Sequence, residues 1–139
     1  RKHLEEMEQY ATIKPVVHQF ELHPAYVPSD IIDYCTGKDI FIQSYASLGE
    51  GALLDPEFLE KNPEFSLLAA KYNCSIAQLL LKWSLQHSWG IIPKSVNLNR
   101  IGENIHLDYF NIESGDIKIL DDFNKKNSFK KCWDSKNVA

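Results

Sequence analysis

Cysteine is scarce in the chain, and its placement suggests no structural use. Among 139 residues there are three cysteines, Cys35, Cys74 and Cys132, with no CxxC pair and no accompanying histidine cluster. This odd, scattered set argues against a disulfide framework and against a zinc site. We therefore expect no metal centre, and reduced thiols fit a cytoplasmic protein best.

Long apolar runs and a strong charge of one sign are also missing. No stretch is long enough to span a bilayer, and the polar, charged first residues do not resemble a signal peptide. A net charge of −4 argues against nucleic acid or an anionic membrane as a partner. Basic residues gather only near the C-terminus, where we interpret them as part of a solvated tail: Lys125, Lys126, Lys130 and Lys131.

Methionine occurs once, at Met7, and the chain begins with Arg1. We interpret this start as a cut from a longer protein, with N-terminal processing as the alternative. The composition is otherwise that of an ordinary globular protein, 44% hydrophobic and 24% charged, and no segment reads as disordered. The length is sufficient for one domain with a modest core.

The pattern of apolar residues predicts strands that alternate with helices, which is typical of a parallel α/β protein. The predicted strands are 16–22, 39–45 and 90–94. The predicted helices are 4–11, 29–37 with Ser29 as N-cap and Gly37 as closing residue, a pair within 55–73 broken at Pro63, 76–85 capped by Ser75, 98–105 and 113–124. A closed (β/α)₈ barrel needs eight strands and roughly 250 residues. Three strands therefore indicate either part of a barrel or a small open sheet.

The strongest site pattern begins at the end of the third predicted strand. Lys94 and Ser95 stand there, and ligands of parallel α/β proteins bind at the carboxyl ends of strands. The amide groups and positive dipole end of the next helix favour a phosphate. Lys94 would add a charge and Ser95 a hydroxyl donor to such a phosphate site.

On the helix that follows, Arg100, Glu103 and Asn104 occupy positions i, i+3 and i+4 and share one face. A guanidinium can fork onto a phosphate, while a carboxylate and an amide can read adenine, so the set fits NADP better than NAD. Taken alone, these residues fit an exposed helix face with an i, i+3 ion pair and a Lys at a strand end better than they fit a cofactor site. The neighbouring apolar stripe, which we expect to pack on the sheet, consists of Leu98, Ile101 and Ile105.

The complete string, Pro-Lys-Ser followed after four residues by Arg-Ile-x-Glu-Asn, resembles the C-terminal signature of the aldo-keto reductases. Residues 15–24 resemble the family's sixth barrel strand, 44–49 the end of its seventh strand, and 69–83 its seventh helix. The resemblance covers about residues 4–125. It implies the C-terminal part of a (β/α)₈ TIM barrel, about strands 6–8 with their helices, over residues 1–124, followed by a tail over 125–139.

The resemblance also implies the roles of individual residues toward NADP(H). Gln19 would hydrogen-bond the nicotinamide carboxamide, and Tyr45 would stack on the nicotinamide ring. Leu48 and its loop would touch the pyrophosphate or ribose. The 2′-phosphate would be held by Lys94, Ser95 and Arg100, and the adenine would contact Glu103 and Asn104. For Tyr45, an aromatic residue at the end of a core strand is the alternative.

No catalytic residue is assigned in this chain. In the family, carbonyl reduction uses a Tyr proton donor with Lys, Asp and His, and strings resembling their contexts are missing here. The resemblance thus implies an NADP(H)-dependent reductase of a small aldehyde or ketone, with the remainder of the barrel as partner and this chain inactive by itself. Two alternatives stay open, a non-catalytic nucleotide-binding or structural member of the family and a fragment with no function of its own.

Overall fold

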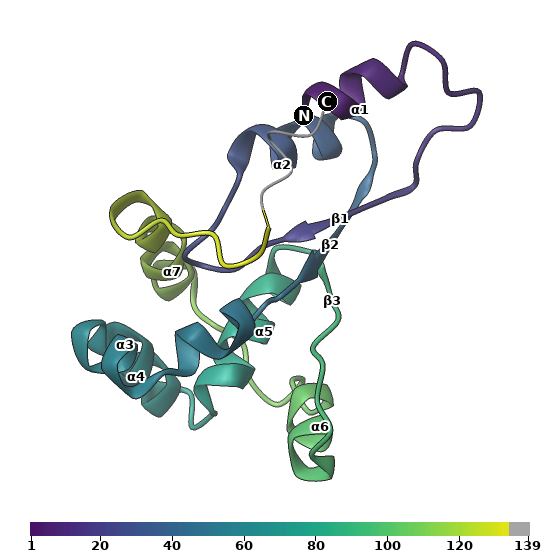
Figure 1. The fold of residues 1–139 in the computed structure, drawn as a ribbon. Coiled ribbons are helices and arrows are strands. Elements are labelled where there is room, and N and C mark those ends of the chain that lie inside the picture. The colour runs from purple at the N-terminus through teal and green to yellow at the C-terminus, as the bar shows by residue number, and fades with distance from the viewer. Residues whose placement is uncertain (134–139) are drawn as a thin grey trace.

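The computed structural model describes residues 1–133, which form a three-stranded parallel sheet with helices around it (Figure 1). The strands β1 (Val17–Glu21), β2 (Phe41–Tyr45) and β3 (Gly90–Ile91) lie in the order β1-β2-β3. The helices are α1 (Lys2–Met7), α2 (Ser29–Gly37), the 3₁₀ helix η1 (Gly49–Leu54), α3 (Pro56–Lys61), α4 (Pro63–Lys71), α5 (Ile76–Gln86), α6 (Leu98–Ile105) and α7 (Ser114–Lys126). The predicted alternation of strands and helices is confirmed.

Short-range sequence signals determine where the best-predicted helices begin. Ser75 begins α5 with a capping box, in which its hydroxyl accepts from the Gln78 amide at 3.1 Å and the Gln78 side chain accepts from the Ser75 amide at 3.0 Å. Pro63 occupies the first turn of α4 and separates it from α3, as predicted. These signals need only neighbouring residues, which is why the sequence alone reveals them.

Other predicted boundaries are wrong. Ser29 is the first residue of α2 and makes no capping hydrogen bond, because Pro28 stands at the N-cap. Gly37 belongs to the helix itself, and Lys38 closes it. The third strand ends at Ile91, so Lys94 lies beyond the sheet; Pro93 has no amide to continue a ladder. Helix α1 ends at Met7, four residues earlier than expected.

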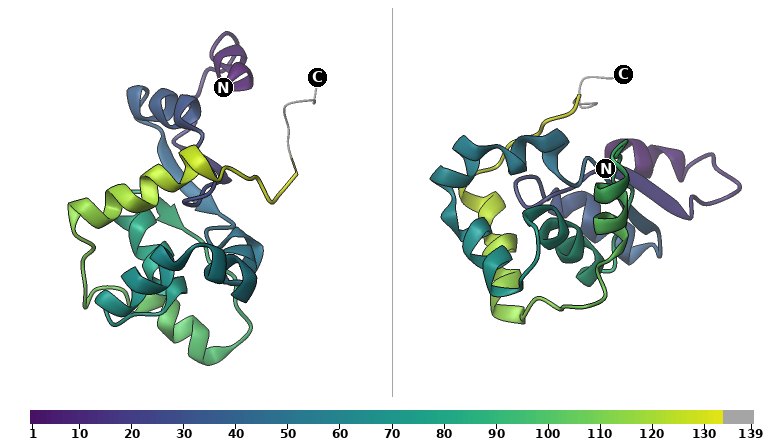
Figure 2. Two further views of the ribbon diagram at one scale, coloured as in Figure 1. Left: turned by 90° about the vertical axis from the view of Figure 1, so that its left-hand side faces the viewer. Right: turned by 90° about the horizontal axis from the view of Figure 1, so that it is seen from below.

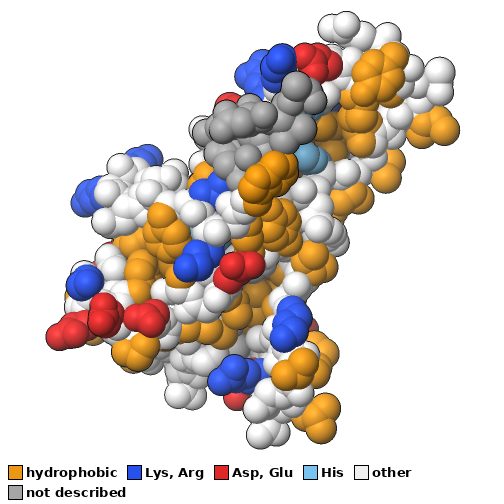
Figure 3. Space-filling view, in the orientation of Figure 1, with side chains coloured by type: hydrophobic (Ala, Val, Ile, Leu, Met, Phe, Trp, Pro, Cys, Tyr) orange, Lys and Arg blue, Asp and Glu red, His pale blue; other side chains and the backbone are white. Residues whose placement is uncertain are grey.

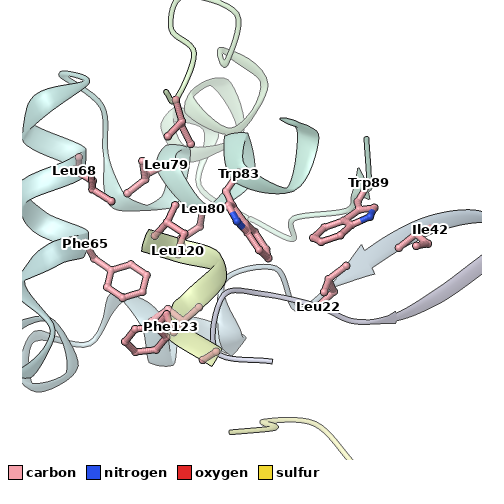
Figure 4. Packing of buried hydrophobic residues seen from close by; sticks show 14 of the residues in the cluster. Leu22, Ile42, Phe65, Leu68, Leu79, Leu80, Trp83, Trp89, Leu120 and Phe123 are labelled. Atoms are coloured by element: carbon pink, nitrogen blue, oxygen red, sulfur yellow. The ribbon is translucent and has the colours of Figure 1, made fainter. Parts of the chain in front are cut away.

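One face of the sheet is covered by helices and holds the core. Leu22 and Ile42 point to this face, where Trp89 packs edge-on against Trp83 of α5 with ring centroids 5.3 Å apart (Figure 4). The opposite face of the sheet is open. Its apolar side chains include Phe41, which is 49% exposed.

The segment after α7 is packed rather than solvated, so the prediction of a solvated tail is wrong for residues 129–132. Helix α7 runs through Lys126, and the predicted boundary at residue 124 therefore falls inside it. The chain then returns to the sheet, where the Phe129 amide donates to the Ala25 carbonyl at 2.9 Å. The predicted tail residues 134–139 lie outside the described residues.

Helix α6 stands apart from the core, at the opposite end of the molecule from α1 (Figures 1 and 2). Its predicted apolar stripe does not pack on the sheet, because the exposed fractions of Leu98, Ile101 and Ile105 are 83%, 39% and 75%. Hydrophobic side chains also lie on the surface along the sheet's edge and beside α6 (Figure 3). Only the end of α6 is anchored, through Gln78 of α5, whose side chain donates to the Glu103 and His106 carbonyls. Across residues 1–133, no helix combines the length and apolarity that crossing a membrane requires.

Candidate cofactor-binding site

Four polar side chains lie on the face of the sheet opposite the core, toward the carboxyl ends of β1 and β2; three of them are at least partly exposed and Glu21 is buried. The strand register pairs Gln19 with Gln43 and Glu21 with Tyr45. Because side chains alternate along a strand, residues paired across these parallel strands and those two positions on share one face. The structure therefore brings Gln19 and Tyr45, predicted from separate segments, onto one surface.

Gln43 is a member of this group that the sequence analysis missed. Its side-chain oxygen accepts a hydrogen bond from Gln19 Nε2 at 2.6 Å. Gly90, across from Gln43 on β3, lets the Phe41 ring pack against the backbone, since a Cβ there would meet that ring at 2.8 Å. The two-residue periodicity of a strand could have identified Gln43, because it puts Gln43 on the same face as Tyr45.

The loop after β2 fixes the end of that strand. Ser44 Oγ donates to the Leu22 carbonyl at 2.7 Å and lies 2.7 Å from Ser47 Oγ. Ala46 takes a left-handed conformation with φ 48°, which turns the chain sharply after Tyr45. Leu48 is half-buried with its side chain against the core, so its backbone is what the loop offers to a ligand. Burial raises the pKa of the Tyr45 hydroxyl, which stays protonated at neutral pH.

A buried acid at the end of β1 ties the C-terminal segment to this site. The Glu21 carboxylate accepts from the amides of Lys131 at 2.6 Å and Cys132 at 2.8 Å, and lies 3.0 Å from His23 Nε2. Burial disfavours its charge, but these hydrogen bonds outweigh burial and hold the Glu21 pKa below its usual range. The sequence analysis missed this residue, although an acid in an apolar strand needs partners.

His23 is fully buried beside Glu21, and burial lowers its pKa despite the neighbouring carboxylate. The neutral ring therefore donates from Nε2 to Glu21. Its Nδ1 has no hydrogen-bond partner within residues 1–133. The ring packs against Phe129, with centroids 5.6 Å apart, so it supports the same C-terminal segment.

The side chain of Asn97 caps the first turn of α6. Asn97 Oδ1 accepts from the amides of Asn99 at 2.9 Å and Arg100 at 3.2 Å, and Ser95 Oγ accepts from the Asn97 amide at 3.1 Å. The Asn97 side chain thus occupies two of the helix amides that we expected to favour a phosphate, those of Asn99 and Arg100. Lys94 and Arg100 are the cationic side chains of this segment.

Both cations are exposed and lack an acidic partner. Within the described part of the chain, neither Lys94 nor Arg100 has a carboxylate oxygen within 4.0 Å, and no ion pair joins Arg100 to Glu103. The face is exposed, as the alternative of an ordinary helix surface expects, but the ion pair of that alternative is missing among the described residues. Asn104 is half-buried on the same helix. The segment thus carries two cations without an ion pair, together with the Glu103 carboxylate and the Asn104 amide on the same helix as Arg100. Among the described residues no group of side chains is arranged to hold a metal ion.

The fold is that of a parallel α/β chain, and the candidate site residues lie at and beyond the carboxyl ends of its strands. The family model of the aldo/keto reductase family matches residues 1–125, and the chain belongs to this family. Glyoxal reductase of Bacillus subtilis is 40% identical over 123 residues, covering 88% of this chain and 42% of that protein. The chain thus spans less than half the length of this relative.

Solved structures agree with the family. An aldo-keto reductase from a Medee basin deep-sea metagenome library superposes with a TM-score of 0.88 at 27% identity, covering 100% of this chain and 50% of that one. A mutant of Gox0644 in complex with NADPH superposes with a TM-score of 0.86 at 28% identity, covering 99% and 48%. The predicted family and the aldo-keto reductase type of fold are confirmed.

Proposed function

We propose that this chain supplies the cofactor-binding half, about strands 6–8, of an NADP(H)-dependent aldo-keto reductase that reduces a carbonyl to an alcohol. The observation that carries the proposal is a pair of cations, Arg100 on α6 and Lys94 in the segment before it. Neither forms an ion pair with a carboxylate among the described residues. Unpaired cations suit the additional phosphate that distinguishes NADP from NAD. The NADPH complex of a structurally similar family member supports the same cofactor.

In this proposal each cluster holds one end of the cofactor. Lys94, Ser95 and Arg100 bind the 2′-phosphate, and Glu103 with Asn104 contacts the adenine. To donate to the phosphate, the Ser95 hydroxyl must give up the hydrogen bond that it donates to the Asn97 carbonyl. The rearrangement is confined to this hydroxyl.

The other end of the cofactor lies on the sheet. Gln19 binds the nicotinamide carboxamide, Tyr45 stacks on the ring, and the loop at Leu48 contacts the pyrophosphate or ribose. Bound NADPH supplies the hydride. The residues of this chain supply only position, by fixing which ring face is presented to the carbonyl carbon.

We assign the proton donor to the remainder of the barrel. Reduction leaves an alkoxide that needs a proton from a positioned acid. The described residues near Gln19 and Tyr45 offer no acid in a family context: Glu21 is buried and holds backbone amides instead. The substrate is a small aldehyde or ketone bound between this chain and that remainder.

Titration of the full-length protein with NADPH and NADH, followed by protein fluorescence, tests the proposal. We expect tighter binding of NADPH and NADPH-dependent reduction of small carbonyls such as glyoxal. Equal affinities for the two cofactors would contradict the assignment of Lys94 and Arg100. NADPH binding without turnover of any carbonyl would instead favour a non-catalytic member of the family.

A further inference from the structure

A cavity of about 270 Å³ lies at the amino-terminal end of the sheet, away from the strand tips that carry the candidate cofactor site. It is enclosed by α1, the loop after α1 and the end of α2, together with Pro15 and Ile40, which precede β1 and β2. Helix α6 lies at the other end of the molecule (Figures 1 and 2). The cavity is therefore separate from the proposed cofactor site.

The floor of the cavity is apolar and firmly packed. Leu4 and Ile40 are 9% and 8% exposed and belong to the main core. Met7, Ala11 and Pro15 complete the apolar wall. Such a surface favours a hydrocarbon ring or chain, because covering it removes apolar area from water.

The rim of the cavity carries an excess of positive charge. Lys38 Nζ lies 2.8 Å from a Glu8 oxygen, and this contact holds the pKa of Glu8 below its usual range. The same ammonium stands 5.8 Å from the centre of the Tyr34 ring. Lys14 also lines the cavity, but within residues 1–133 no carboxylate lies within ion-pair distance of it. Two cations thus share one carboxylate at the rim, since the charge of Lys14 also acts on Glu8, and the rim keeps one net positive charge.

We propose that this cavity binds a small monocarboxylate with an apolar body of one ring or a short chain. The carboxylate pairs with Lys14, and the body rests on Leu4, Met7 and Ile40. The volume of about 270 Å³ falls just below the roughly 300–1,000 Å³ typical of ligand sites, which selects a small molecule. An amine would be repelled by Lys14 and Lys38, and a neutral molecule would leave Lys14 unpaired.

Methyl NMR of the full-length protein tests this site, with phenylacetate as probe and phenylacetamide as its neutral match. We expect the methyl signals of Met7 and Ile40 to shift with phenylacetate at an affinity on the order of millimolar. The amide should bind about three- to fivefold more weakly, as the loss of an exposed charge pair implies. No shift up to about 10 mM phenylacetate, or equal affinities for acid and amide, would overturn the proposal.

Three variants distinguish the contribution of the Lys14 charge from that of the shape of the cavity. Lys14→Gln should weaken phenylacetate binding about three- to fivefold and leave phenylacetamide unaffected. Ala11→Phe, which fills the cavity from its rim, should remove the binding of both probes. Lys2→Gln removes a cation from α1, outside the cavity, and should change neither. If Lys14→Gln weakens both probes equally, Lys14 is not the carboxylate partner. NADPH binding should be unchanged in every variant, so failure here is distinguishable from failure of the proposed cofactor site.

Discussion

Gln19 and Gln43 meet across β1 and β2, where Gln19 Nε2 donates to Gln43 Oε1 at 2.6 Å. This hydrogen bond occupies one donor of Gln19 and sets the plane of its carboxamide. Gln19 itself is exposed, so the rest of its carboxamide is accessible from the open side of the sheet. Under the proposed function, Gln43 is thus a positioning residue for the group that binds the nicotinamide carboxamide.

Gln43→Ala should weaken NADPH binding by about 0.5–1.5 kcal/mol, because Gln19 loses the partner that orients it. The dissociation constant from fluorescence titration measures the effect. Gln43→Glu keeps the acceptor and should restore most of the affinity, whereas Gln9→Ala, an exposed amide near α1, should have no effect. An unchanged affinity in Gln43→Ala would remove Gln43 from the site.

Arg100→Ala should weaken the binding of NADPH by about 1.5–3 kcal/mol and that of NADH far less, since only NADPH carries the 2′-phosphate. Isothermal titration of both cofactors gives the two changes directly. Lys118→Ala, which removes an exposed cation from α7, serves as the matched control. Similar losses for both cofactors would show that Arg100 does not contact the phosphate.

His23 should make the protein less stable in mild acid. Its folded-state pKa is lowered by burial, so the unfolded chain binds the proton more readily. The free energy of unfolding should therefore fall as the pH drops below about 6.5, the ordinary histidine pKa, toward the lowered folded pKa. Glu21, whose folded pKa is also lowered, adds a further loss near and below pH 4.

Urea unfolding between pH 7 and pH 5 measures the histidine contribution. His23→Gln retains a donor for Glu21 but does not titrate in this range, and it should flatten the dependence. His3→Gln, at the exposed N-terminus, should leave the slope unaltered. An identical slope in His23→Gln would assign the acid sensitivity to other groups.

Ser75→Ala should destabilise the fold by about 1 kcal/mol, because it removes the hydroxyl that caps α5. The change is read from the urea midpoint of the full-length protein. Ser66→Ala, at an exposed position inside α4, keeps the same chemistry without a cap and should be neutral or slightly stabilising. Equal effects of the two substitutions would contradict a capping role for Ser75.

Features that depend on close neighbours were predictable. The capping box at Ser75, the break at Pro63 and the bounds of α6 all follow from residues within one or two turns. The signature from Lys94 to Asn104 was readable for the same reason, since its spacing alone places three polar groups on one helix face. Prediction was poorest at Ser29 and Gly37, where two residue types common in caps lie inside the helix.

The placement of Gln43 against Gln19 depended on strand register, which joins residues 24 positions apart. The contact of Glu21 with Lys131 spans 110 positions, so no local pattern could show that the C-terminal segment is packed. The stripe of α6 was predicted correctly as apolar but wrongly as buried, because burial depends on what stands opposite.

The sequence by itself determined the alternation of strands and helices, the family resemblance and the residues proposed for NADP(H), because periodicity, caps and motif spacing are properties of neighbouring residues. The tertiary structure decided which of those side chains share a surface, which cations lack a counter-charge, and which acid is buried. Those properties arise only when distant segments exclude water from one another and compete for the same hydrogen bonds.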